Sequence, residues 1–203
     1  MNYNTIIFDL GGVLIDWNPE YLYRKIFDDK AQMQRFLTEV CHGDWNREQD
    51  RGRPFAEAVK ERTALYPHYE AEIRAYHERW EEMLGGAIEE NVAVLEDLRT
   101  RADIALYAIT NWSAETFPIA QREYPFLEYF QDTVVSGELK VVKPDARIYQ
   151  TLLDRQPEII LEKSIFIDDV TENIAGAEAF GIQGIHLTPE TNLSEELERL
   201  GVL

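Results

Sequence analysis

The chain contains very little cysteine and no long hydrophobic segment. Cys41 is the only cysteine among 203 residues, so an internal disulfide is excluded, which fits a reducing compartment. No window approaches the ~18 apolar residues that a transmembrane helix needs. The stretch from Met1 to Asp9 also lacks the basic region and the apolar segment of a secretory signal. We therefore expect a cytoplasmic protein without a membrane partner.

Basic residues are also scarce. The chain has 20 Lys and Arg against 38 Asp and Glu, which gives a formal net charge of −18. A surface this acidic repels nucleic acids and anionic lipids, so we expect neither as a partner. A phosphate-binding site in such a chain would need local positive charge from a metal ion, a lysine and oriented backbone amides.

Short apolar runs rich in β-branched residues alternate with helix-like stretches, which indicates an α/β fold with a parallel sheet. The expected strands are Thr5–Phe8, Ile104–Ile109, Thr133–Val135, Ser164–Ile167 and Gly184–Leu187. The expected helices between them are Ala114–Arg122, Ala146–Arg155 and Thr171–Phe180.

The interval from about Asp16 to Gly86 interrupts this alternation and contains no convincing strand. It instead predicts helices over Glu20–Asp28, Ala31–Val40, Pro54–Leu65 and Tyr69–Leu84, the last of them ended by Gly85 and Gly86. A helical block inserted after the first strand would form a lid over the carboxyl edge of the sheet, or an appendage that only packs against it.

Polar residues follow four of the apolar segments. They are Asp9, Thr110 with Asn111, Lys143, and Asp168 with Asp169. Each has an ordinary explanation: a turn aspartate before glycines, two helix-capping residues, a solvated lysine, and two exposed turn aspartates. The carboxyl ends of parallel strands share one edge of the sheet, however, where ligands bind. A coincidence at all four places is improbable. Adjacent carboxylates after a buried strand also call for a compensating cation, and oxygen ligands suit Mg²⁺.

The order and spacing of these four segments resemble the four motifs of the haloacid dehalogenase superfamily. The motifs are carried by Asp9, Thr110, Lys143 and the pair Asp168-Asp169, and the resemblance covers essentially the whole chain. The resemblance implies a Rossmann-like parallel sheet core with an inserted α-helical cap of the first type. The core would comprise residues 1–16 and 87–203, and the cap residues 17–86. Asn173, Gly176, Ala177 and Gly181 are similar to the bacterial sugar-phosphatase branch, of the glucose-1-phosphate phosphatase type. The cap residues Trp45, Glu48, Arg51 and Gly52 also resemble that branch.

The resemblance implies a Mg²⁺-dependent phosphatase of small phosphorylated metabolites, acting through an aspartyl-phosphate on Asp9. Mg²⁺ would be held by Asp9, the backbone carbonyl of Gly11, Asp169 and, directly or through water, Asp168. Lys143 would neutralise charge, and Thr110 with the Asn111 amide would orient the phosphate. Trp45, Glu48 and Arg51 would face the substrate, while Trp17 and Trp80 either line the cleft or pack the cap.

The chain departs from the superfamily at Gly11, where most phosphatases carry a second aspartate that acts as acid and base. Either a cap residue, with Glu48 as the candidate, or water substitutes for it, or the substrates have leaving groups that need little protonation, such as the hemiacetal oxygen of a sugar 1-phosphate. Three alternatives remain open. The first is a 2-haloacid dehalogenase, which the paired aspartates argue against. The second is a phosphotransferase, which normally keeps the second aspartate that Gly11 replaces here, and the third is a non-catalytic binding protein. We expect a monomer or a weak dimer.

Overall fold

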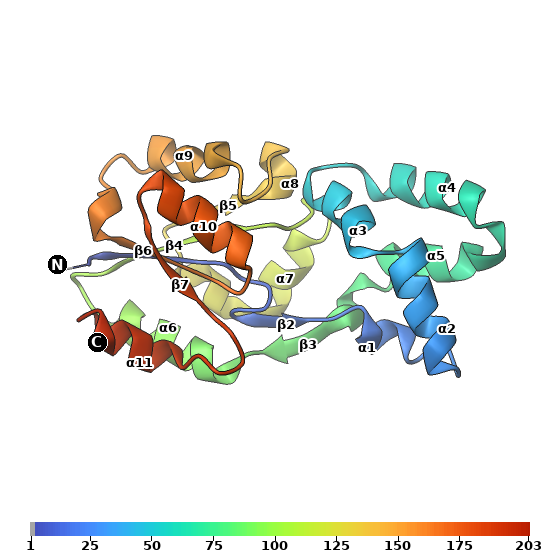
Figure 1. The fold of residues 1–203 in the computed structure, drawn as a ribbon, viewed down its shortest axis with the longest axis horizontal. Helices are drawn as coiled ribbons and strands as arrows, with labels where there is room; N and C mark the ends of the chain where they lie inside the picture. Colours follow the sequence, from blue (N-terminus) through green and yellow to red (C-terminus); the bar gives the residue numbers. More distant parts are fainter. Residues whose placement is uncertain (1–2) are drawn as a thin grey trace.

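The computed structural model describes residues 3–203 and contains a parallel sheet of five strands in the order β5-β4-β1-β6-β7 (Figure 1). Its strands are β1 (Thr5–Phe8), β4 (Ala105–Thr110), β5 (Asp132–Val135), β6 (Ser164–Asp168) and β7 (Gln183–His186). They match the five expected strands to within one residue at either end, so the predicted α/β class and parallel sheet are confirmed.

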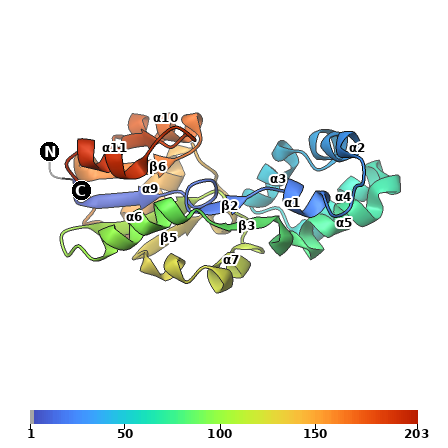
Figure 2. The ribbon, with the colours of Figure 1, turned by 90° about the horizontal axis from the view of Figure 1, so that it is seen from below.

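Helices cover both faces of the sheet, as the two perpendicular views show (Figures 1 and 2). One face packs against α9 (Ala146–Arg155) and α10 (Thr171–Phe180). The other packs against α6 (Glu89–Arg99), α7 (Phe117–Glu123) and α11 (Leu193–Arg199). Because alternate residues of a strand point to opposite faces, Ile7 contributes to the first layer while Ile6 and Phe8 contribute to the second. This double burial explains the uninterrupted apolar run of β1.

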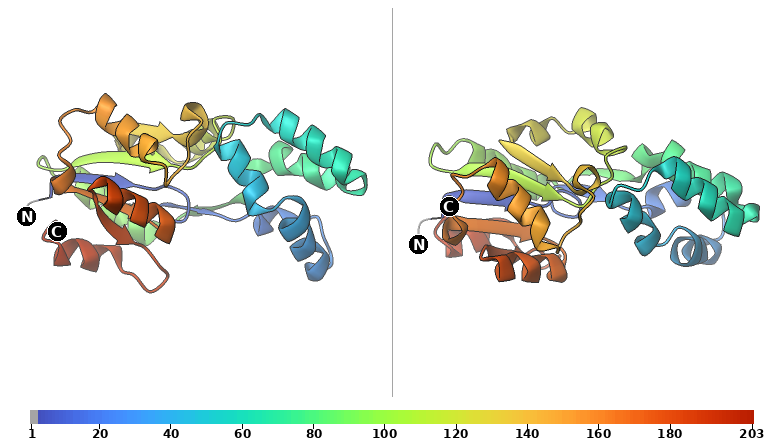
Figure 3. Two further views of the ribbon diagram at one scale, coloured as in Figure 1. Left: turned by 45° about the horizontal axis from the view of Figure 1, so that its top comes forward. Right: turned by 90° about the horizontal axis from the view of Figure 1, so that it is seen from above.

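The inserted block forms a second group of helices beyond one end of the sheet (Figures 1 and 3). Its α-helices are α1 (Glu20–Tyr23), α2 (Lys30–Arg35), α3 (Gly43–Asp50), α4 (Phe55–Leu65) and α5 (Glu70–Glu78). Aromatic side chains fill the space between them; Tyr76, for example, packs against Trp45, Phe55 and Tyr23. We call this block the cap. Its predicted boundaries at residues 17 and 86 stay a prediction.

Several details of the cap differ from expectation. The interval does contain strand residues, because β2 (Ile15–Trp17) and β3 (Leu84–Ala87) pair as an antiparallel ribbon that joins cap to core. Gly85 and Gly86 therefore belong to a strand and do not end a helix. Three expected helices are shorter than predicted. The first ends at Tyr23 instead of Asp28, and the other two continue as a π-helical turn (Phe36–Val40) and a 3₁₀ turn (Trp80–Met83). Helix α3 was not expected at all. Within residues 3–203, no helix combines the length and the apolar character needed to cross a bilayer.

Candidate active site

The carboxyl edge of the sheet gathers the predicted polar residues in one place. β1 lies between β4 and β6, with Phe8 in register with Ala108 on one side and Ile167 on the other. Asp9 directly follows β1, while Thr110 and Asp168 end the neighbouring strands. Oxygen atoms of Asp9, Asp168 and Asp169 lie within 4.8 Å of one another. The residues that the sequence placed at one edge are therefore neighbours in space.

Lys143 occupies the centre of this cluster and is completely buried, at 0% exposure. Its ammonium lies 2.6 Å from Asp168 Oδ2 and 2.9 Å from Asp9 Oδ1, and it donates a hydrogen bond to the Ile109 carbonyl. Burial alone would lower the pKa of Lys143, but Asp168 and Asp9 outweigh it and hold the pKa above its ordinary value. Lys143 is therefore a fixed positive charge in an acidic protein, and the interpretation as a solvated lysine is wrong.

Two asparagines hold this network in place. The side chain of Asn111 accepts a hydrogen bond from the Lys143 backbone N–H at 2.8 Å and donates one to the Lys143 carbonyl at 3.3 Å. Asn173 donates to both oxygens of Asp168 at 3.0 and 3.1 Å. Thr110 and Asn111 do not cap a helix, because α7 begins at Phe117 with Thr116 at its N-cap. The capping interpretation of these two residues is wrong.

The carboxylates carry more negative charge than Lys143 alone balances. Burial raises the pKa of Asp9, Lys143 opposes this, and Asp168 and Asp169 raise it further. Burial also raises the pKa of Asp169, with Asp168 adding to the effect. Both Asp168 oxygens accept hydrogen bonds from Lys143, Asn173 or the Val170 N–H. Asp9 and Asp169 thus fit a hard divalent cation with oxygen ligands, whereas Asp168 is engaged mainly in holding Lys143.

Two glycines follow Asp9, and they serve different purposes. A Cβ atom on Gly12 would lie 2.3 Å from Asp169 Oδ2, and Gly12 has φ +75°. Asp169 can approach the turn after β1 only because this side chain is absent. Gly11, in contrast, has open space where a Cβ would be and does not require a left-handed conformation.

Some buried polar atoms at the site have no hydrogen-bond partner within residues 3–203. They include Thr110 Oγ1, Trp17 Nε1 and Trp112 Nε1. Thr110 is only 1% exposed, so its unpaired hydroxyl carries a desolvation cost. Such a cost is reduced when a ligand supplies the missing partner.

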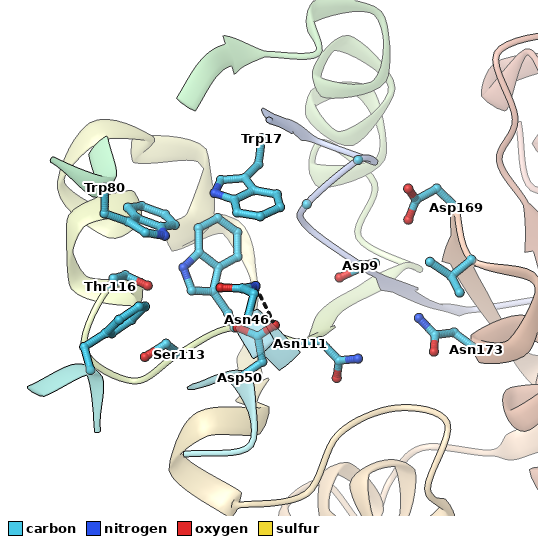
Figure 4. Close-up of a pocket in the computed structure, with 15 residues that line it drawn as sticks. Asp9, Trp17, Asn46, Asp50, Trp80, Asn111, Ser113, Thr116, Asp169 and Asn173 are labelled. Carbon is cyan, nitrogen blue, oxygen red and sulfur yellow. Dashed lines mark hydrogen bonds between the residues drawn. The ribbon is translucent and has the colours of Figure 1, made fainter. Parts of the chain in front are cut away.

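A cavity of about 260 Å³ opens from this cluster toward the cap (Figure 4). Asp9, Asp169 and Asn173 lie on one side of it in this view, and Trp17 and Trp80 on the other. The lining residues from the cap and the ribbon are Trp17, Asn46, Asp50, Phe55 and Trp80. Its chemistry is therefore mixed, with anionic and amide groups at the core end and aromatic walls together with Asn46 and Asp50 at the cap end.

The cap residues predicted to face the substrate do not line this cavity. Trp45 is 3% exposed, packs edge-on against Tyr76 inside the cap and does not line the cavity. Glu48 and Arg51 form an ion pair at the surface and do not line it either, so Glu48 is not placed to replace an acid at position 11. On helix α3 the lining residues are Asn46 and Asp50. Trp45 and Gln49 form the buried face of α3, so Asn46 and Asp50, one position further along, lie on a neighbouring face. The helical spacing could have identified Asn46 and Asp50 as lining residues, but only if α3 itself had been predicted.

The cap is seated directly on the core. Ser136 Oγ donates to the Asp50 carbonyl at 2.6 Å, Arg47 donates to the Lys143 carbonyl at 3.1 Å, and the Phe55 N–H donates to Glu115 at 2.8 Å. A Cβ on Gly52 would lie 2.7 Å from the Gly137 carbonyl. These contacts fix the end of helix α3 against the core loop beside the cavity.

A parallel sheet with a buried lysine–carboxylate cluster at its carboxyl edge, beneath a helical insert, defines the class as an α/β protein with a capped acidic site. The chain belongs to the haloacid dehalogenase-like hydrolase family, whose profile matches residues 3–181. The predicted superfamily is thus confirmed.

Several known proteins are similar over almost the full chain. The sesquiterpene phosphatase astK of Aspergillus oryzae is 26% identical, over 98% of this chain and 96% of its own. The phosphorylated carbohydrates phosphatase of Thermotoga maritima is 27% identical, over 90% and 83%. A HAD family enzyme of Bacteroides thetaiotaomicron, solved as a magnesium complex, has the same fold, with a TM-score of 0.76, 20% identity and coverage of 97% and 99%.

Proposed function

We propose that the protein is a Mg²⁺-dependent phosphatase of small phosphorylated metabolites that uses Asp9 as its nucleophile. The observation that carries this proposal is the cluster of Asp9, Lys143 and Asp169 at the inner end of a cavity. The relatives named as phosphatases support it, and so does the magnesium complex of a structural relative.

In the first step, an Asp9 oxygen attacks phosphorus and the bond to the leaving oxygen breaks. Water then attacks the resulting aspartyl-phosphate, which releases inorganic phosphate and restores the carboxylate. Lys143 holds Asp9 in position and supplies positive charge beside it, and the Thr110 hydroxyl donates to a phosphate oxygen. Asp9 and Asp169 would hold Mg²⁺, with the Gly11 carbonyl as a further ligand and Asp168 next to them. The bound ion would neutralise the phosphate charge.

For the substrate class we propose sugar phosphates, including the glucose-1-phosphate type. Aromatic walls suit the apolar faces of a sugar ring, while Asn46, Asp50 and Ser113 offer hydrogen bonds to its hydroxyl groups. The relative that acts on phosphorylated carbohydrates supports this choice. A sesquiterpene phosphate would use the tryptophans but would leave these polar groups without partners.

We expect phosphate release from sugar phosphates in Mg²⁺ and loss of nearly all activity in a chelator. A colorimetric screen over sugar phosphates, prenyl phosphates, nucleotides and phosphorylated acids, run under both conditions, tests function and substrate class together. Equal rates with and without chelator would contradict the metal dependence. Chloride release from a 2-haloacid in chelator would identify a dehalogenase instead.

We also expect Thr110→Val to slow phosphate release by about 10²-fold, because one charge-stabilising donor is lost. The free energy of unfolding of this variant should equal or slightly exceed that of the wild type, since the hydroxyl that is replaced has no hydrogen-bond partner. Thr63→Val is the matched control. Thr63 Oγ1 is also buried and unpaired within residues 3–203, but Thr63 belongs to cap helix α4, whereas Thr110 ends β4 beside Asp9 at the carboxyl edge of the sheet. A Thr110→Val enzyme with wild-type turnover would contradict the role of Thr110.

A further inference from the structure

We propose that Asp50, carried by cap helix α3, is the general acid that protonates the leaving oxygen and the general base that activates the water. This proposal rests on the phosphatase function proposed above. Asp50 lines the same cavity as Asp9 but belongs to the cap, whereas Asp9 and Asp169 belong to the core. It is the one further acidic side chain among the cavity-lining residues of the described chain.

The position of Asp50 follows from the geometry of phosphoryl transfer. The attacking and leaving oxygens lie roughly in line through phosphorus. If Asp9 attacks from the core, the leaving oxygen points away from the core toward the cap. The water that opens the aspartyl-phosphate must approach from that same side. An acid carried by α3 therefore faces the place where both proton transfers occur, and Figure 4 shows Asp50 beside Asn46, below Trp17 in that view.

The surroundings of Asp50 favour a carboxyl group that holds its proton near neutral pH. Burial is the main reason that the pKa of Asp50 is raised to about 8; Arg47 and the Ser113 backbone oppose this shift, and the Asp9 charge adds to it. Asn46 Nδ2 donates to Asp50 Oδ2 at 3.2 Å and fixes the side chain. The hydrogen bond from Ser136 to the Asp50 carbonyl fixes its backbone against the core. Asp9 and Asp169 are unsuitable as acids because one must be the ionised nucleophile and the other a metal ligand.

The proton balance closes over both steps. As Asp9 attacks and the bond to the leaving oxygen breaks, the Asp50 proton passes to that oxygen and Asp50 becomes a carboxylate. This carboxylate then accepts a proton from the attacking water, whose oxygen binds phosphorus as the bond to Asp9 breaks. Asp50 is protonated again at the end of the cycle, and no further reactant is needed.

The test compares two aromatic phosphates whose leaving groups differ in basicity. p-Nitrophenyl phosphate leaves as a weakly basic phenolate, whereas benzyl phosphate leaves as a strongly basic alkoxide that needs protonation. We expect Asp50→Asn to slow the phosphorylation of Asp9, measured in a single turnover, by about 10²–10⁴-fold with benzyl phosphate and by less than about tenfold with p-nitrophenyl phosphate. The water step is common to both substrates and should slow equally for both. Asp44→Asn, an exposed acid on the same helix, is the control and should change neither rate.

A second variant tests the role by rescue. Gly11 lines the same cavity and has room for a side chain, so Gly11→Asp can carry a carboxyl group into it. In the Asp50→Asn background it should restore kcat for benzyl phosphate at least about tenfold. A folded double variant as slow as Asp50→Asn alone would overturn the proposal. So would an Asp50→Asn enzyme whose phosphorylation step slows equally with both substrates or with neither. A wild-type enzyme that releases no phosphate from either would instead reject the phosphatase function itself.

Discussion

Replacing Asp9 by asparagine is expected to reduce phosphate release by at least about 10⁴-fold, because the substituted amide cannot form the aspartyl-phosphate. The fold should persist. An asparagine oxygen can still accept the hydrogen bond that the Leu10 N–H makes to Asp9 Oδ1 at 2.7 Å. The substitution also removes one of three clustered carboxylates, whose mutual repulsion and burial raise the pKa of Asp9. The free energy of unfolding should therefore change little.

Phosphate release and thermal unfolding of the same preparation separate these two effects. Acid-quenched wild-type protein should carry a phosphoryl group on Asp9 by mass spectrometry, and the Asp9→Asn variant should carry none. Asp44→Asn serves as the neutral control for loss of one negative charge at an exposed position. If the Asp9→Asn enzyme turns over at the wild-type rate, Asp9 is not the nucleophile and the proposed mechanism fails.

The core and its site residues were predictable from the sequence because both depend on local signals. Buried parallel strands produce uninterrupted apolar runs, and the residue after such a run lies at a known edge of the sheet. Asp9, Thr110 and Asp168 required no tertiary information beyond this rule. Lys143 could be placed near the edge, but its full burial could not be foreseen. That burial depends on Asn111, which holds the Lys143 backbone, and on Asp168, which pairs with its ammonium.

The cap was less predictable because its signals are tertiary. Helix α3 has the sequence GDWNREQD, whose buried residues include only one apolar side chain, so hydrophobic periodicity could not reveal it. Which of its faces meets the core is decided by docking contacts such as Ser136 with Asp50. Strand β3 contains Gly85 and Gly86, which disfavour strands when read locally. Its pairing with β2 supplies the stabilisation that its composition lacks.

Lys143→Met should cause the largest combined loss of activity and stability. The ammonium contacts Asp168, Asp9 and the Ile109 carbonyl, and it has no exposed surface. Its removal leaves two buried carboxylates without their cation, which costs about 3–5 kcal/mol in the free energy of unfolding. Without this opposing charge the pKa of Asp9 rises further, and the protonated side chain is a poor nucleophile. We expect kcat to fall at least about 10³-fold.

The dependence on pH distinguishes this explanation from a simple packing defect. A carboxyl group whose pKa is raised in the folded state keeps its proton at pH values where the unfolded state has already released it. The free energy of unfolding must therefore fall as the pH rises from the unfolded-state pKa to the folded-state pKa. The free energy of unfolding of Lys143→Met should therefore decrease more steeply than that of the wild type between about pH 5 and about pH 8. Urea denaturation in chelator measures this slope. Adding Asp168→Asn to Lys143→Met removes one stranded carboxylate, and it should recover part of the loss and flatten the slope. Parallel pH profiles for Lys143→Met and wild type would mean that the lysine contributes packing rather than charge, and the cluster could not then hold Asp9 ionised in the way the proposed reaction requires.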